Sequence, residues 1–96
     1  GITYRENSLI AFYTNGQVRE GILAEDTTIN GITYTNWKSV YGLQYSGITQ
    51  SISFHENRQV RAGTLAEDTT INGTTYAGYS RIYFDEDGNV TSGTEA

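Results

Sequence analysis

Cysteine and proline are both absent from this chain of 96 residues. Without cysteine, a disulfide framework and a thiolate metal site are excluded. Without proline, exposed strands lack one common form of protection against pairing with another chain. No apolar run approaches the roughly 20 residues that a membrane-spanning helix needs, so we expect no membrane insertion.

Basic residues are also scarce. Six lysines and arginines stand against 11 acidic residues, which gives a net charge of −5, and Lys38 is the only lysine. Nucleic-acid binding normally requires a basic stripe that neutralises phosphates, so we expect no nucleic-acid partner. The abundance of Thr, Ser, Asn, Gly and Tyr favours a bacterial protein that is secreted or displayed at the cell surface.

An internal repeat is the most informative feature of the chain. The nine residues from Leu23 to Gly31 recur without change from Leu65 to Gly73. A Gly-x-Thr-Tyr string begins at Gly1, Gly31 and Gly73. A second element begins at Phe12, Phe54 and Phe84, with Asn-Gly, Asn-Arg or Asp-Gly three residues later, then Val and Gly. Fixed-period repetition of this kind indicates a repeat architecture.

Cutting before each Gly-x-Thr-Tyr gives three units within one β-repeat domain, 1–96. The units are 1–30, 31–72 and 73–96. The second carries an insertion near 35–46, and the third is truncated where Glu95 and Ala96 replace the Leu-Ala of the shared stretch. We expect either a processed protein or a piece of a longer array.

Short alternating apolar runs bounded by turn signals predict an all-β fold. Ile and Phe alternate before each Asn-Gly-type turn, and a strand restarts at the following Val. Asn30-Gly31 and Asn72-Gly73 predict a second hairpin in each complete unit. Arg58 stands where the other turns have glycine, so we expect it at positive φ. The sequence predicts an antiparallel meander of repeated β-hairpins, either an open, solenoid-like sheet or a sheet curled into a small barrel.

The predicted core collects the apolar and aromatic positions that the units share. It comprises Tyr4, Ile10, Phe12, Val18, Leu23, Ile29, Tyr34, Ile48, Ile52, Phe54, Val60, Leu65, Ile71, Tyr76, Ile82, Phe84 and Val90. Because a single hairpin cannot bury its apolar face, successive units must pack against one another.

The element that begins at Phe12, Phe54 and Phe84 resembles the bacterial variant of the MORN repeat, which has an aromatic residue, then Asn-Gly, then a glycine. The resemblance covers about ten residues per unit. It implies hairpins that stack into an elongated antiparallel sheet, and a role in binding or scaffolding. The longer unit and the Leu-Ala-Glu-Asp-Thr-Thr-Ile stretch depart from that pattern.

Most polar clusters have a structural explanation. Neighbouring carboxylates on an extended chain point in opposite directions, so Glu25-Asp26 and Glu67-Asp68 predict polar turns rather than acid–base pairs or calcium ligands. The run from Asp85 to Asn89 predicts a hairpin tip. His55 is the only histidine, and we expect a solvated turn residue. We therefore expect no metal site, no cofactor and no catalytic residue.

The insertion differs in kind, because it occurs once and contains the only tryptophan and the only lysine. Exposed aromatic side chains are frequent anchors for protein or carbohydrate partners. The candidate binding residues are Trp37, Lys38, Tyr41 and Tyr45. The alternative is an extra hairpin in which Tyr41, Leu43 and Tyr45 alternate into the core.

These observations predict a non-enzymatic β-repeat module for binding or assembly, with an aromatic loop presented to a protein or glycan. One alternative is a purely structural, self-assembling array, and a less favoured one is an enzyme with a site at the unit junctions. Unpaired strand edges readily recruit another chain, so we also expect a homo-oligomer, most simply a dimer.

Overall fold

The computed structural model describes the backbone of residues 2–6, 10–40, 43–49 and 51–96, together with the side chains of these residues outside 37–49. Twelve β-strands and no helix occur in this part of the chain, and every strand pair is antiparallel. The predicted all-β, antiparallel fold is confirmed.

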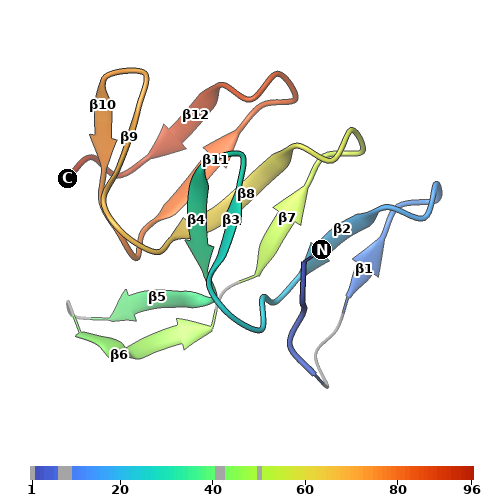
Figure 1. The fold of residues 1–96 in the computed structure, drawn as a ribbon, viewed down its shortest axis with the longest axis horizontal. Helices are drawn as coiled ribbons and strands as arrows, with labels where there is room; N and C mark the ends of the chain where they lie inside the picture. Colours follow the sequence, from blue (N-terminus) through green and yellow to red (C-terminus); the bar gives the residue numbers. More distant parts are fainter. Residues whose placement is uncertain (1, 7–9, 41–42, 50) are drawn as a thin grey trace.

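Three hairpins lie side by side and form the main sheet, with their turns on the same side of the molecule (Figure 1). The strand order in this sheet is β1-β2-β7-β8-β11-β12. The six strands are β1 (Ala11–Phe12), β2 (Val18–Gly21), β7 (Ile52–Phe54), β8 (Val60–Leu65), β11 (Arg81–Phe84) and β12 (Val90–Gly93). The second strand of each hairpin pairs with the first strand of the next.

Three further hairpins leave this plane. They are β3 (Thr27–Ile29) with β4 (Ile32–Thr35), β5 (Trp37–Val40) with β6 (Leu43–Thr49), and β9 (Thr69–Ile71) with β10 (Thr74–Tyr76). Strand β4 also pairs with the end of β8, so β3 and β4 branch from the main sheet and bring it to eight strands. The hairpins β5–β6 and β9–β10 each form a separate two-stranded sheet.

The sheet is open, so the predicted alternative of a small barrel is wrong. Within the described residues, β1 and β12 are the two ends of the strand order and do not pair with each other. The two strands of each hairpin are consecutive in sequence, but the sheet as a whole is not a meander. Strand β2 is followed in space by β7, because the hairpins between them in sequence fold away from the plane.

The hairpin turns follow the sequence closely. Gly16, Arg58 and Gly88 have φ angles of 86°, 74° and 88°, so Arg58 does take the left-handed conformation that its position predicts. The same backbone hydrogen bond closes all three turns, from the residue after Phe to the carbonyl four residues later. Its N···O distances are 2.8, 2.8 and 2.9 Å at Tyr13, His55 and Asp85.

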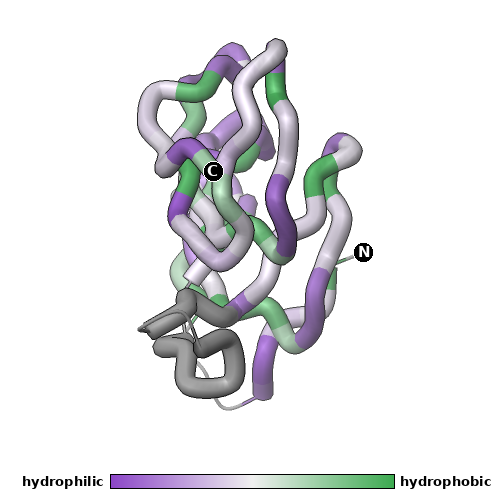
Figure 2. Tube along the Cα trace, turned by 90° about the vertical axis from the view of Figure 1, so that its left-hand side faces the viewer, coloured by the Kyte–Doolittle hydropathy of each residue, from purple (hydrophilic) through white to green (hydrophobic). Residues whose placement is uncertain are grey.

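The core lies on one face of the main sheet. Strands β7 and β11 bury alternate residues, as a sheet with one covered face requires. Central strand β8 buries every residue except Arg61. Hydrophobic stretches along the chain are accordingly short and separated by hydrophilic ones (Figure 2). The buried hydrophobic cluster comprises Leu23, Tyr34, Ile52, Phe54, Val60, Leu65, Ile82 and Phe84.

Two members of the predicted core are exposed. Ile10 keeps 37% and Phe12 58% of its surface accessible, because they flank and occupy edge strand β1, which has no further described strand beyond it. The side chain of Ile48 lies outside the described part. Tyr4, Val18, Ile29, Ile71, Tyr76 and Val90 are partly buried and pack against the cluster.

A tyrosine ring lying over a glycine occurs three times. A Cβ added at Gly21, Gly63 or Gly93 would lie 2.7, 2.7 or 2.8 Å from Cδ1 of Tyr4, Tyr34 or Tyr76. The backbone of each tyrosine pairs with the residue two positions after its glycine. These partners are Leu23, Leu65 and Glu95. Each tyrosine therefore ties the segment that covers the sheet to a strand of the hairpin beneath it.

Tyr34 makes the most enclosed of these contacts, with 1% of its surface exposed. Burial raises the pKa of its hydroxyl well above the ordinary value, because the ionised form would lose its water. Folding therefore favours the neutral phenol. This contribution is complete below the pKa of the unfolded chain, near 10, and declines as the pH rises beyond it.

We expect Gly63→Ala to lower the free energy of unfolding by about 2 kcal/mol, because the new methyl group would overlap a ring that has no room to move. Chemical denaturation followed by circular dichroism measures the change. Gly93→Ala is the matched control. It creates the same overlap with the half-buried Tyr76 at an exposed edge, so its cost should be about half or less. Equal costs would contradict the role assigned to burial.

Candidate functional site

The insertion forms an arm, which we define as the hairpin β5–β6. Trp37 pairs with Thr49, Lys38 with Ile48, and Val40 with Leu43. Of the predicted binding residues, Trp37 and Lys38 lie on β5 and Tyr45 lies on β6. Tyr41 lies outside the described residues, as do the side chains of the other three. The arm makes its own two-stranded sheet and shares no strand pair with the main sheet in the part of the chain described.

Both ends of the arm are fixed to the scaffold. Before it, Thr35 is buried in β4 and pairs with Thr64, and the Asn36 side-chain amide donates to the Leu23 carbonyl over 2.9 Å. After it, the Ser51 hydroxyl donates to Glu20 over 2.7 Å. The predicted insertion near 35–46 therefore begins with two residues of the scaffold, and the arm itself spans 37–49.

Beyond the arm, Ser51 is held from a second direction. The Arg81 guanidinium donates to its backbone carbonyl and also to the Thr64 hydroxyl, the latter over 3.3 Å. Arg81 comes from β11, so a residue of the third unit fixes the exit of the arm in the second. The arm is consequently attached to a part of the molecule that several strands hold in place.

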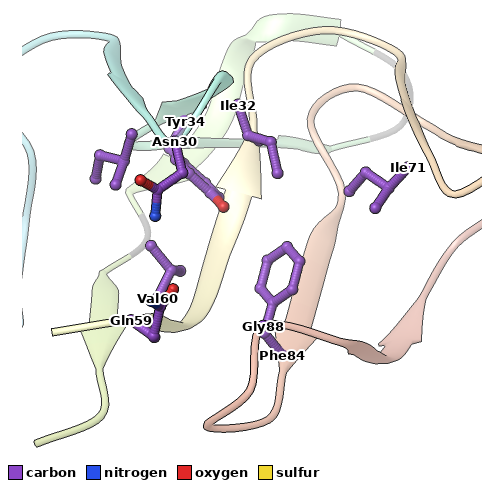
Figure 3. Close-up of a pocket in the computed structure, with 9 residues that line it drawn as sticks. Asn30, Ile32, Tyr34, Gln59, Val60, Ile71, Phe84 and Gly88 are labelled. Atoms are coloured by element: carbon purple, nitrogen blue, oxygen red, sulfur yellow. The ribbon is translucent and has the colours of Figure 1, made fainter. Parts of the chain in front are cut away.

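A groove lies where neighbouring hairpins meet beneath the covering segments. It is lined by Ile29, Asn30, Ile32, Tyr34, Gln59, Val60, Ile71, Phe84 and Gly88. The Phe84 ring points into it, with Val60 on one side and Ile71 on the other (Figure 3). The groove encloses only about 150 Å³, less than the volume typical of small-molecule sites.

A second groove, of about 460 Å³, lies one unit earlier and has residues at six of the nine equivalent lining positions. Its lining residues are Ile2, Tyr4, Gln17, Val18, Phe54 and Arg58. In both grooves a Tyr, an Ile, a Gln and a Val from one unit receive the Phe of the next. The two grooves are thus junctions in which one hairpin packs against its neighbour.

Polar contacts at the hairpin tips reinforce these junctions. The Tyr13 hydroxyl donates to the Phe54 carbonyl over 2.7 Å, and Nε2 of His55 lies 3.0 Å from the Phe84 carbonyl. The expectation of a solvated His55 is only partly correct, since the residue does belong to a turn but is half-buried. Its ring nitrogen serves the junction between the second and third hairpins.

Asp85 occupies the same position in the third hairpin and behaves differently. Its carboxylate accepts hydrogen bonds from the backbone of Asn89 and Asp87, both over 2.9 Å. These bonds lower the pKa of Asp85 because they favour its charged form, and the bond from the Asn89 backbone contributes most. This agrees with the predicted hairpin tip, in which the carboxylate is used within its own turn.

The other acidic pairs also have structural contacts. The Thr27 and Thr69 hydroxyls donate to the carbonyls of Glu25 and Glu67 over 2.9 and 2.8 Å. Asp68 accepts a hydrogen bond from the Gly78 backbone over 2.8 Å. Among the residues that the structure describes, no three His, Cys, Asp or Glu side chains gather in a way that could hold a metal ion.

The groove-lining residues Ile32, Gln17 and Gln59 were not among the predicted functional residues. The signal for them was available, because Gln17 and Gln59 hold equivalent places before Val18 and Val60. The sequence did not show which unit supplies the residues on the opposite wall of each groove.

Comparison of the chain with protein families, with curated proteins and with solved structures gave no match. No helix of the described chain is long and apolar enough to cross a membrane.

We expect Arg58→Gly to raise the free energy of unfolding by about 0.5 kcal/mol. Relief of the left-handed backbone outweighs the greater freedom of glycine in the unfolded chain. The variant loses the 2.7 Å bond from Arg58 Nε to Gln17, which is exposed and contributes little. Thermal denaturation measures the change. Gln17→Ala, which removes the same bond without altering the backbone, is the control and should have little effect. A lower midpoint for Arg58→Gly would contradict the strain argument.

Proposed function

We propose that this protein is a non-enzymatic binding module in which the main sheet acts as a scaffold and the arm, β5–β6, contacts a protein or glycan partner. One observation carries the proposal. The distance from a Cβ at Gly63 to Tyr34 is 2.7 Å, the same as at Gly21 and Tyr4, although 12 more residues separate the pair in the second unit. The contact between tyrosine and glycine therefore has the same geometry in the unit that carries the arm and in a unit that lacks it.

An element that the scaffold does not need is free to serve another purpose. The composition of the arm supports binding, since Trp37, Tyr41 and Tyr45 offer large amphipathic side chains and Lys38 a positive charge. Aromatic residues supply much of the binding energy at protein interfaces. Anchoring by Asn36 and Ser51 reduces the ordering cost when a partner binds.

The alternatives remain proposals of lower rank. A purely structural array would use the arm as additional architecture. An enzyme would require a site at the hairpin junctions, and the two grooves there are lined mainly by Ile, Val, Tyr, Phe and Gln. A third pocket, at the hairpin tips, is lined by Tyr13, His55, Glu56, Asn57 and Glu86, but Nε2 of His55 is already bonded to the Phe84 carbonyl. The resemblance to the bacterial MORN-repeat variant and the secreted or surface location likewise stay predictions, supported by sequence motif and composition.

Deleting residues 37–48 should leave the scaffold folded and remove partner binding. The deletion joins Asn36 to Thr49, which pairs with Trp37 at the base of the arm, and restores the spacing from tyrosine to phenylalanine found in the other units. We expect the β-sheet circular dichroism signal to persist and the thermal midpoint to change by only a few degrees. On a glycan array, signals given by the full chain should disappear.

A second deletion of the same length provides the control. Removing residues 66–77 takes out β9–β10 together with Tyr76, which packs on the core, so it should lower the thermal midpoint strongly. If deletion of 37–48 unfolds the protein as well, the arm is part of the architecture and the proposed function is wrong.

The fluorescence of Trp37 should report an exposed side chain, because it is the only tryptophan and the proposal makes it a contact residue. We expect red-shifted emission that iodide quenches readily. Emission shifted to the blue and protected from quenching would place the ring among packed side chains, which would contradict its role as an anchor.

A further inference from the structure

The two edges of the main sheet are unlike. Phe12 on edge strand β1 and Ile10 just before that strand are 58% and 37% exposed. Phenylalanines at the equivalent place in the inner hairpins, Phe54 and Phe84, are 5% and 7% exposed. Each inner phenylalanine stands in the groove of the preceding unit, whereas no such groove lies beside Phe12 in the part of the chain that the structure describes.

The opposite edge carries the matching half of a groove. Val90 and Tyr76 hold the places of Val18 and Tyr4 in the first groove, and the Tyr76 ring lies over Gly93 as the Tyr4 ring lies over Gly21. Gly93 and its neighbours on β12 are exposed. One edge thus presents the phenylalanine of a junction, and the other edge presents most of the groove residues that would contact it.

We propose that a second copy of this chain fills the gap, with β12 of one copy pairing antiparallel with β1 of the next. The internal junctions supply the register, since Gly21 pairs with Ile52 and Gly63 with Ile82. By the same register Gly93 pairs with Ile10 of the second copy. Phe12 of that copy then stands beside Val90 and Tyr76, and its apolar surface leaves water.

Charge permits this arrangement. At the internal junction the second and third hairpin tips touch, as the 2.9 Å bond from the Asn57 amide to the Glu86 carbonyl shows. In the proposed contact the acidic tip, Asp85 to Asp87, lies beside the first tip of the second copy, Thr14 to Gly16, which carries no charge. No pair of like charges opposes the contact at the tips.

The proposed contact is weaker than the internal ones. Thr74 takes the place of Ile2 and Ile32 in the groove, and Asp85 replaces the side-chain donors of the other tips. An ionised Asp85 cannot donate to the Phe12 carbonyl of the second copy. We therefore expect association that is reversible and depends on protein concentration.

The geometry also changes the expected type of oligomer. A contact between unlike edges leaves one free edge of each kind on every assembly, so it extends into chains instead of closing as a symmetric dimer. The inference does not involve the arm, and it stands or falls separately from the proposed function.

Sedimentation velocity over a range of concentrations tests the proposal, with Phe12→Ser as the first variant. The full chain should show a mean mass that rises with concentration, and Phe12→Ser should weaken association by about 10-fold or more because the buried ring is lost. Phe12 is exposed in a single copy, so the thermal midpoint and circular dichroism at low concentration should not change.

Tyr83→Ser is the matched control. Tyr83 is also a large exposed aromatic residue, at 42%, but it lies on β11 between two other strands and points away from the core face. Its loss should leave association unchanged. Equal weakening by both variants would indicate non-specific hydrophobic association and overturn the proposal.

Mixing the full chain with Phe12→Ser distinguishes unlike edges from a symmetric contact. The variant keeps its β12 edge, so it can cap one end of a growing chain, and the mean mass should fall as the variant is added. In a symmetric pairing of β1 with β1, the variant would not join the full chain and would leave its assemblies intact. That result, or a strict monomer at all concentrations, would overturn the proposal.

Asp85→His provides a gain of association. His55 at the second tip reaches the Phe84 carbonyl of the next hairpin. A histidine at the third tip could reach the Phe12 carbonyl of the second copy in the same way, so association should tighten several-fold. No tightening, in a variant whose circular dichroism is unchanged, would show that the register derived from the internal junctions is wrong.

Discussion

The packing of a tyrosine ring on a glycine is the contact on which the rest of this structure depends. A strand residue with any side chain would hold the ring away from the sheet, because a Cβ at Gly63 would already lie within 2.7 Å of Tyr34. The close approach allows the tyrosine backbone to pair with the continuation of the same strand, at Leu65. One contact therefore fixes both the distance of the covering segment from the sheet and its register along it.

This constraint explains how a chain with few apolar residues forms a core. With 36% hydrophobic residues and no disulfide, the protein cannot rely on a large buried volume. Each tyrosine instead brings a covering segment onto the sheet, and the apolar residues of that segment, such as Ile32, contribute to the groove that receives the next phenylalanine. The cost of ordering the segments is offset at the junctions, where several elements bury surface together.

Much of the local structure could be predicted from the sequence. The turn at Arg58 was predicted from the glycines at the equivalent places, and its φ of 74° bears this out. Alternation identified Ile52 and Phe54 as one buried face. These properties depend on neighbours in the sequence and on the two-residue period of a strand, both of which can be read directly from the residues.

Long-range placement could not be read in the same way, as Phe12 and His55 illustrate. Phe12 lies in the same motif as Phe54, yet it is exposed, because burial depends on whether another hairpin lies beside it in space. His55 binds the Phe84 carbonyl, 29 residues away, and no local pattern indicates that partner. The arm is a similar case, since the sequence marks it as unique but the independence of its sheet depends on strand pairing.

Equivalent positions of the repeat differ in their surroundings. A junction position is buried when a neighbouring hairpin is present and exposed when none lies beside it, as the exposed fractions of 5% at Phe54 and 58% at Phe12 show. At the third tip Asp85 replaces the donors Tyr13 and His55, and β12 is there the end of the described strand order. Strong inner junctions together with outer edges weakened in this way are what the proposed reversible association requires.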